Sequence, residues 1–109
     1  MPNFLFAYRM PKDYRPGSAD TVAAWNSWFE SMGASLVDRG NGVIESSTLG
    51  HSDADTRLGG YSLITADDFE AAVALAKGCP ALKLDKGGVE IGALLELDRG
   101  TRLSADTPA

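Results

Sequence analysis

The order of elements between Gly59 and Leu97 limits the possible folds more than any other feature of this sequence. A strand, a helix, a glycine break and another strand follow one another there. We expect the helix to begin at Asp67, because its carboxylate can cap the first turn and Glu70 completes a capping box. The segment Lys77–Pro80 then supplies a basic last turn, a C′ glycine and a proline stop. The apolar stripe of this helix consists of Phe69, Ala72, Val73 and Ala76.

The first part of the chain shows the same succession of strand and helix. Asn3–Arg9 alternates along its length, with an aromatic residue at every second position, which predicts a strand. A helix is predicted from Ser18 or Asp20 to Met32, and Gly33 is expected to end it. Its apolar stripe contains Val22, Trp25, Phe29 and Met32, widened by Ala24 and Trp28.

The middle of the chain has weaker β signals. Leu36–Asp38, a turn or bulge at Gly40–Gly42 and Val43–Glu45 indicate an irregular second strand or a short hairpin. The segment Ser46–Arg57 is polar, and we expect a surface loop there. The two remaining predicted strands are Leu58–Thr65 and Val89–Leu97.

These elements predict an α+β protein with the ferredoxin-like order βαββαβ, in which a four-stranded antiparallel sheet carries both helices on one face. We expect one domain over residues 1–97 and a polar, flexible tail over residues 98–109. The first, third and fourth strands carry apolar residues on both faces, so two helices leave one apolar face uncovered. A second copy packed sheet against sheet is the predicted cover. The chain is therefore expected to form a homodimer, with a ligand cavity between the sheets or between sheet and helices.

Several segments resemble the YCII-related (DGPF-type) domain family. They are Gly60–Asp67, Ala76–Leu82 and Gly87–Ile91, together with Ala24–Phe29 followed by Leu36–Asp38. The resemblance covers most of the chain up to Leu97 and implies a dimeric α/β barrel built on the ferredoxin-like fold. It also implies, for some members, enzymes that act on small organic acids, including a dehydrochlorinase-like activity.

The enzyme-like members of that family are associated with a histidine on the first helix paired with an aspartate. The corresponding stretch here, Val22–Trp28, contains no histidine, and the DGPF motif is absent before Gly59. The resemblance therefore implies the fold and the dimer rather than the family's active site.

Composition argues against several classes of function. The net charge is −5 and there is no long Lys/Arg cluster, whereas nucleic-acid binding usually requires a basic surface. No apolar run approaches the roughly 18 residues that span a bilayer. The N-terminus lacks the pattern of a signal peptide, and Cys79 is the single cysteine, so a cytoplasmic location is expected. We expect neither a cofactor nor a metal.

Three residues are weak catalytic candidates: His51, Asp38 and Tyr61. His51 is the only histidine and lies among carboxylates, so it has the chemistry of a general base. Its polar surroundings favour a solvated loop instead. Cys79 follows a helix C-terminus, where the helix dipole opposes a thiolate, and a structural role is expected for it.

The residues predicted to bind a ligand are aromatic or basic: Tyr8, Arg9, Trp25, Trp28 and Tyr61. Aromatic residues at strand and helix spacing are more often core, although a pocket beside the core can use both. Arg9, with Lys12 and Arg15, lies near the start of the first helix, where an anion could bind.

The preferred interpretation is a non-catalytic homodimeric domain that binds a small organic or aromatic acid. Two alternatives stay open. One is an enzyme of the same fold that performs proton transfer or elimination through Asp38, Tyr61 or His51. The other is an assembly module that binds no small molecule.

Overall fold

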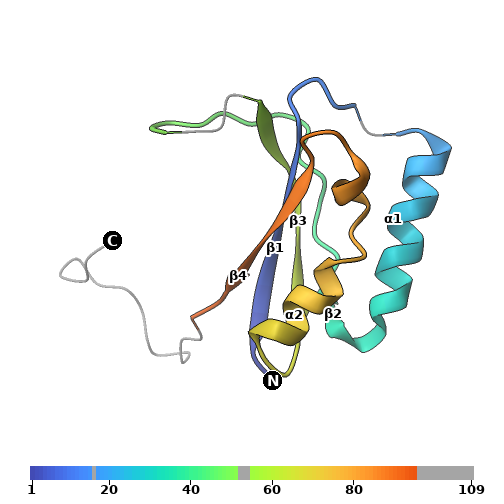
Figure 1. Cartoon of the computed structure of the whole chain (residues 1–109), viewed down its shortest axis with the longest axis vertical. Helices are drawn as coiled ribbons and strands as arrows, with labels where there is room; N and C mark the ends of the chain where they lie inside the picture. The colour runs from blue at the N-terminus through green and yellow to red at the C-terminus, as the bar shows by residue number, and fades with distance from the viewer. Residues whose placement is uncertain (16, 52–54, 96–109) are drawn as a thin grey trace.

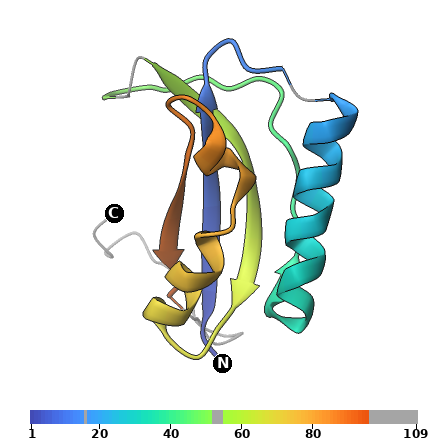
Figure 2. The ribbon, with the colours of Figure 1, turned by 45° about the vertical axis from the view of Figure 1, so that its right-hand side comes forward.

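One antiparallel sheet of four strands, with two α-helices packed against one of its faces, makes up the fold (Figures 1 and 2). The structure is a computed structural model that describes residues 1–15, 17–51 and 55–95. The strand order is β2-β3-β1-β4, so β1 and β3 are central and β2 and β4 lie at the edges. This α+β arrangement is compatible with a ferredoxin-like fold. The predicted tail 98–109 lies outside the described residues.

The elements in chain order are β1 (Asn3–Pro11), α1 (Ala19–Met32), β2 (Leu36–Asp38), β3 (Thr56–Thr65), α2 (Phe69–Ala76) and β4 (Gly88–Ala93), with short 3₁₀ helices at Gly33–Ser35 and Pro80–Lys83.

The boundaries predicted for the first helix are confirmed. The Ser18 hydroxyl accepts a hydrogen bond from the backbone N–H of Thr21 at 3.2 Å, which caps α1. Gly33 ends the helix with a φ of +54°, a conformation that glycine adopts without steric cost. Local signals at both ends therefore set the length of α1.

The cap predicted for the second helix is wrong by one residue. Asp68, not Asp67, has the extended backbone of an N-cap, and its carboxylate accepts a hydrogen bond from the N–H of Ala71 at 2.7 Å. Glu70 therefore occupies the first turn without completing a capping box. Gly78 does not have the positive φ expected of a C′ glycine. Glycine is needed there for close packing, because a Cβ would lie 3.0 Å from Cδ1 of Trp28.

The predicted second strand is shorter than expected, and no hairpin forms. β2 contains three residues, and the following segment lies along β3 instead. Asn41 accepts a hydrogen bond from the N–H of Tyr61 at 3.2 Å, and the N–H of Val43 donates to Gly59 at 3.0 Å. Glycine is needed at position 40, because a Cβ there would lie 1.9 Å from the carbonyl oxygen of Tyr61.

The last two strands also differ from their predicted bounds. β3 begins at Thr56, within the predicted surface loop, and β4 ends at Ala93. Leu97, the predicted end of that strand, is outside the described residues. The pair Gly59-Gly60 lies inside β3 at a bulge opposite Tyr8 and Arg9.

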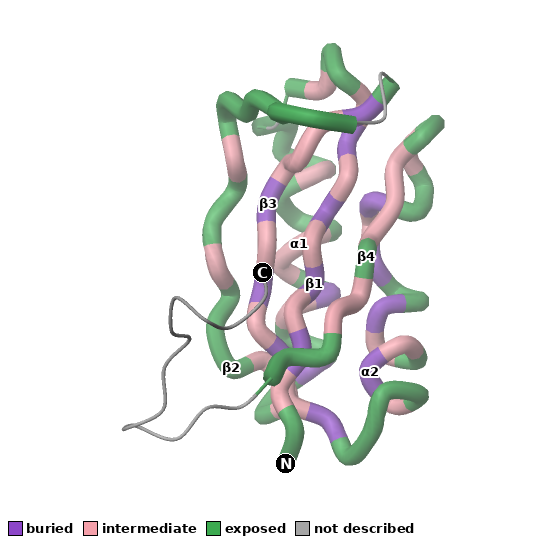
Figure 3. The backbone as a smooth tube through the Cα atoms, turned by 90° about the vertical axis from the view of Figure 1, so that its left-hand side faces the viewer, coloured by how far each residue is buried: buried purple, intermediate pink, exposed green. Residues whose placement is uncertain are grey.

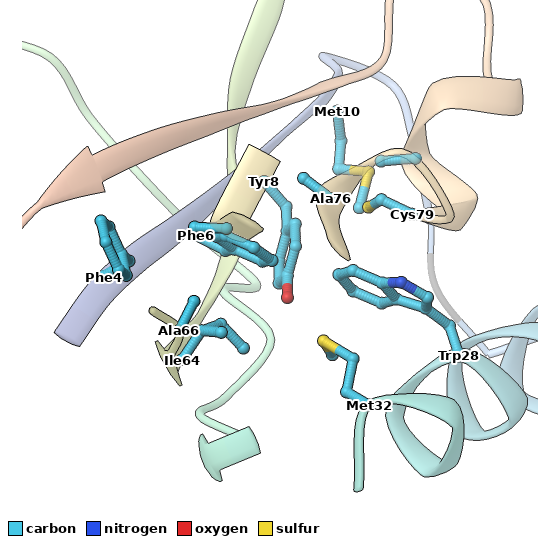
Figure 4. Packing of buried hydrophobic residues seen from close by; sticks show 12 residues of the cluster. Phe4, Phe6, Tyr8, Met10, Trp28, Met32, Ile64, Ala66, Ala76 and Cys79 are labelled. Atoms are coloured by element: carbon cyan, nitrogen blue, oxygen red, sulfur yellow. The ribbon is translucent and has the colours of Figure 1, made fainter. Parts of the chain in front are cut away.

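The core fills the space between the helices and the covered face of the sheet (Figure 4). Phe6 is fully buried and stacks on Trp28, with 6.1 Å between ring centroids. The Trp28 indole N–H donates to the carbonyl of Leu75 at 3.1 Å, which joins the two helices. Cys79 is 1% exposed beside them. The buried apolar residues are Phe4, Phe6, Tyr8, Met10, Trp28, Met32, Ile64, Ala66, Ala72, Ala76, Cys79 and Ala81.

The other face of the sheet carries no helix (Figure 3). Leu5 and Leu63 are register partners on it and both are half-buried. β4 departs from the expectation that it is apolar on both sides. Val89 and Ile91 pack against the core, whereas Glu90, between them, is exposed. The open face is therefore apolar at Leu5 and Leu63 and polar at Glu90.

Candidate small-molecule site

A pocket of about 240 Å³ opens between α1, the middle of β1 and β3, and the segment after β2. This volume lies below the ~300–1,000 Å³ typical of sites for drug-sized ligands, so it suits a compact molecule. The side chains that matter most for its chemistry are Tyr8, Trp25, Asn26, Phe29 and Arg39.

Aromatic rings form the inner wall of the pocket. The ring of Tyr8 meets that of Trp25 edge to face, with 4.7 Å between centroids. Trp25 also contacts Phe29, at 5.8 Å between centroids. Trp25 and Phe29 come from the same face of α1 because they are four residues apart. Tyr8 is fixed by β1, and Trp25 and Phe29 are fixed by α1, so the rings form a rigid wall on which a flat apolar group can stack.

A buried chain of hydrogen bonds connects the pocket to the segment after β2. The Tyr8 hydroxyl donates to the Ser62 hydroxyl at 2.8 Å, which donates in turn to the carbonyl of Arg39 at 2.7 Å. Burial raises the pKa of Tyr8 well above its usual range, and this outweighs the opposing effect of the bond to Ser62. The phenol is therefore neutral at physiological pH and acts as a hydrogen-bond donor.

Arg39 supplies the charge of the pocket. Its guanidinium carbon lies 4.7 Å from the centre of the Phe29 ring, a cation–π distance, and its Nη2 donates to Oδ1 of Asn26. Among the described residues that line the pocket, Arg39 is the one charged side chain. The two contacts with α1 orient the guanidinium at the pocket, where its remaining donors suit a carboxylate.

The structure brings together three of the five residues predicted to bind a ligand. Tyr8, Trp25 and Tyr61 line the pocket. Tyr61 is the register partner of Ala7, so its side chain lies on the open face of the sheet, where its hydroxyl accepts a hydrogen bond from Nδ2 of Asn41 at 3.1 Å. Trp28 lies behind the wall in the core. Arg9 lies on the other side of the sheet, where its side chain donates to Oγ1 of Thr56.

The three catalytic candidates are not brought together. The Asp38 carboxylate turns back on its own backbone and accepts a hydrogen bond from the N–H of Gly40 at 2.8 Å. His51 is exposed beside a second hollow, on the Arg9 side of the sheet. Tyr61 alone belongs to the pocket. Cys79 has the structural position expected for it, and burial raises the pKa of its thiol to about 11.

Sequence reasoning missed Arg39 and the backbone of Gly40–Gly42, which closes one side of the pocket. The available signal was the spacing of the two glycines directly after a basic residue. The sequence predicts a turn or bulge there, within an irregular second strand or a short hairpin, because nothing local shows that the segment folds back along β3.

Comparisons with protein families, curated proteins and solved structures find no match to this chain. Within the described ranges, no group of three or more His, Cys, Asp and Glu side chains is placed to hold a metal ion. In the same part of the chain, no helix is long and apolar enough to cross a membrane.

Proposed function

We propose that this protein binds a small planar aromatic carboxylate in the pocket beside α1. The observation that carries the proposal is the pairing of an aromatic wall, Tyr8 with Trp25, with a single cation, Arg39, fixed by Asn26 and Phe29. A flat ring would stack on the wall while its carboxylate accepts hydrogen bonds from the guanidinium. The small volume favours one ring over an extended ligand.

Binding explains the site better than proton transfer does. The described lining holds no carboxylate and no imidazole, the groups that most often act as general bases. Tyr8, its most buried ionisable group, has a pKa raised away from physiological pH. The lining instead combines apolar rings with one group for orientation, as recognition sites do.

The proposal includes assembly as a homodimer of ferredoxin-like subunits, in the manner of the YCII-related family that the sequence resembles. Its support is the open face of the sheet, where Leu5 and Leu63 lie side by side without a helix above them. Val37 is 56% exposed and adds to the apolar surface of the β2 edge. Apolar patches of this kind usually mark an interface.

Ligand binding is tested with benzoate, benzyl alcohol and cyclohexanecarboxylate, followed by tryptophan fluorescence and calorimetry. Benzoate should bind most tightly, because it alone of the three combines a flat aromatic ring with a carboxylate charge. Arg39→Met should weaken benzoate binding about tenfold or more, the value of a charge-assisted hydrogen bond, and leave benzyl alcohol unchanged. Lys77→Met is the matched control, since Lys77 is exposed and lines neither this pocket nor the hollow around Arg9. Equal benzoate affinity in the Arg39→Met variant and the unmodified protein would overturn the proposal.

Dimer formation is tested separately by analytical ultracentrifugation. The unmodified protein should sediment as twice its 11.5 kDa mass at micromolar concentration. Leu63→Glu places a charge on the open face and should give monomers, whereas Ala23→Glu, on the exposed side of α1, should not. A single 11.5 kDa species in the unmodified protein refutes the dimer and leaves the ligand proposal standing.

A further inference from the structure

A second hollow, of about 410 Å³, lies on the opposite side of the sheet from the aromatic pocket. It is formed where the C-terminal part of β1, the start of β3 and the turn before β4 meet Thr48 and His51. The two hollows share no lining residue among those described. The side chains around this one are Arg9, Thr48, His51, Thr56, Lys86 and Glu90.

Arg9 is held in a fixed position in this hollow. Its Nε and Nη2 both donate to Oγ1 of Thr56, at 3.3 Å and 3.0 Å. Thr56 is itself 8% exposed, so the anchor is part of the folded sheet. Within the described chain, no carboxylate lies within ion-pair distance of the Arg9 guanidinium. A guanidinium has five N–H donors, and those of Nη1 are not used by the contacts with Thr56.

Lys86 reaches the same hollow from the turn between the second 3₁₀ helix and β4. Its backbone φ is +66°, and it is the one non-glycine residue with a positive φ among those described. The turn is closed by a hydrogen bond from the N–H of Gly87 to the carbonyl of Leu84 at 3.0 Å. Glycine is the usual residue at such a position. A lysine there is strained, and strained residues of this kind gather at functional sites.

Arg9 is the cation of this hollow that forms no ion pair with a described carboxylate. Arg9 and Lys86 supply two cations, and the Lys86 ammonium is exposed 3.4 Å from the carboxylate of Asp55. Glu90 is the one carboxylate among the described lining residues. The hydroxyls of Thr48 and Thr56 add neutral polar groups. Guanidinium, ammonium and hydroxyl groups together are the donors that bind phosphate and carboxylate.

We propose that this hollow is a second binding site, specific for a small oxyanion, in which Arg9 is the principal donor and Lys86 a supporting one. The oxyanion is a phosphate group or the carboxylate of a small molecule, since both accept hydrogen bonds from a guanidinium. Glu90 weakens binding through its like charge and thereby limits the site to ligands that engage Arg9 directly. This site does not depend on the aromatic pocket.

The probes are inorganic phosphate and acetate, each titrated into the full chain at constant pH and ionic strength, with chloride as the reference salt. Nitrogen–proton NMR follows the Arg9 Nε–H and the backbone amides of Gly87 and Gly88. Phosphate should shift these signals saturably, and acetate should do so more weakly if the site prefers phosphate. The opposite order would assign the site to carboxylates.

Three variants and one control separate the site from general screening. Arg9→Met should weaken binding at least tenfold. Lys86→Gly should weaken it severalfold without lowering the melting temperature, because glycine relieves the positive φ. Glu90→Gln should strengthen binding severalfold. Lys77→Met removes an exposed cation that lines neither hollow and should leave phosphate affinity unchanged.

Two results would overturn the proposal: shifts that chloride reproduces at equal ionic strength, or equal phosphate affinity in the Lys86→Gly, Glu90→Gln and unmodified proteins. The latter comparison holds even if Arg9→Met fails to fold. Sedimentation in the same buffers distinguishes a loss of anion binding from a change of assembly on the open face.

Discussion

Removing the Ser62 hydroxyl should destabilise this protein, and removing the Tyr8 hydroxyl as well should restore part of the loss. The reason lies in the direction of the hydrogen bonds, from Tyr8 to Ser62 and from Ser62 to the carbonyl of Arg39. In Ser62→Ala, the Tyr8 hydroxyl stays in place but has lost its acceptor in a site that is 3% exposed. In Tyr8→Phe, by contrast, Ser62 keeps its bond to Arg39.

The expected free energies follow from this difference. Tyr8→Phe loses one hydrogen bond and should cost about 1 kcal/mol. Ser62→Ala leaves a buried donor unsatisfied and should cost about 2 kcal/mol. In the double variant the unsatisfied phenol is gone and the carbonyl of Arg39, an exposed residue, can bind water, so the cost should return to about 1 kcal/mol. The same Tyr8→Phe change is thus destabilising in one background and stabilising in the other.

Urea unfolding, followed by tryptophan fluorescence at a single protein concentration, measures all four proteins. Each kcal/mol corresponds to a shift in melting temperature of about 4–8 °C for a domain of this size. The double-mutant cycle isolates the coupling between the two hydroxyls. Equal destabilisation by Tyr8→Phe in both backgrounds would refute the proposed direction of the hydrogen bonds.

Three further predictions concern the remaining contacts. Asp68→Ala should lower the free energy of unfolding by about 1 kcal/mol, whereas Asp67→Ala should change it little, as thermal unfolding can show; the reverse ranking would mean that the helix begins earlier. Gly78→Ala should destabilise the protein, measured by urea unfolding, because its Cβ would lie 3.0 Å from the Trp28 ring, and Gly88→Ala, where no atom lies within 4 Å, is the control. The raised thiol pKa of Cys79 means that the native state holds its proton longer than the unfolded state, so this contribution to stability is complete below pH 9 and is lost as the pH rises towards about 11. Between pH 9 and about 11, the free energy of unfolding should fall less steeply with pH in Cys79→Ala than in the unmodified protein. The same pH dependence in both proteins would contradict the raised thiol pKa.

The sequence predicted the elements whose signals are local. The first helix has a serine cap, a regular apolar stripe and a terminal glycine, and these signals agree with one another. The second helix is less well determined, because Asp67 and Asp68 are both able to cap it. The extended backbone of Asp68 decides between them, and that conformation depends on the path of the chain from β3.

The candidate site was predictable only where residues of regular elements form it. Tyr8 and Trp25 were found because strand and helix spacing place aromatic rings towards the covered face of the sheet. Trp28 could not be separated from Trp25 in the same way, since both lie on that face of α1. Packing places Trp28 in the core, because Gly78 has no side chain and leaves room for the Trp28 ring. Arg39 depends on a loop that returns along β3, which no nearby residue indicates.

The return of the chain along β3 also decides where this sheet is vulnerable to aggregation. Asn41 and Val43 use backbone groups at the outer edge of β3 beyond the end of β2, so a foreign strand finds fewer free partners there. β4 has no neighbouring strand on its outer side within the described residues. Under stress, strand addition from another molecule should therefore begin at β4, and a proline introduced on that edge would be the natural means of suppressing fibrils.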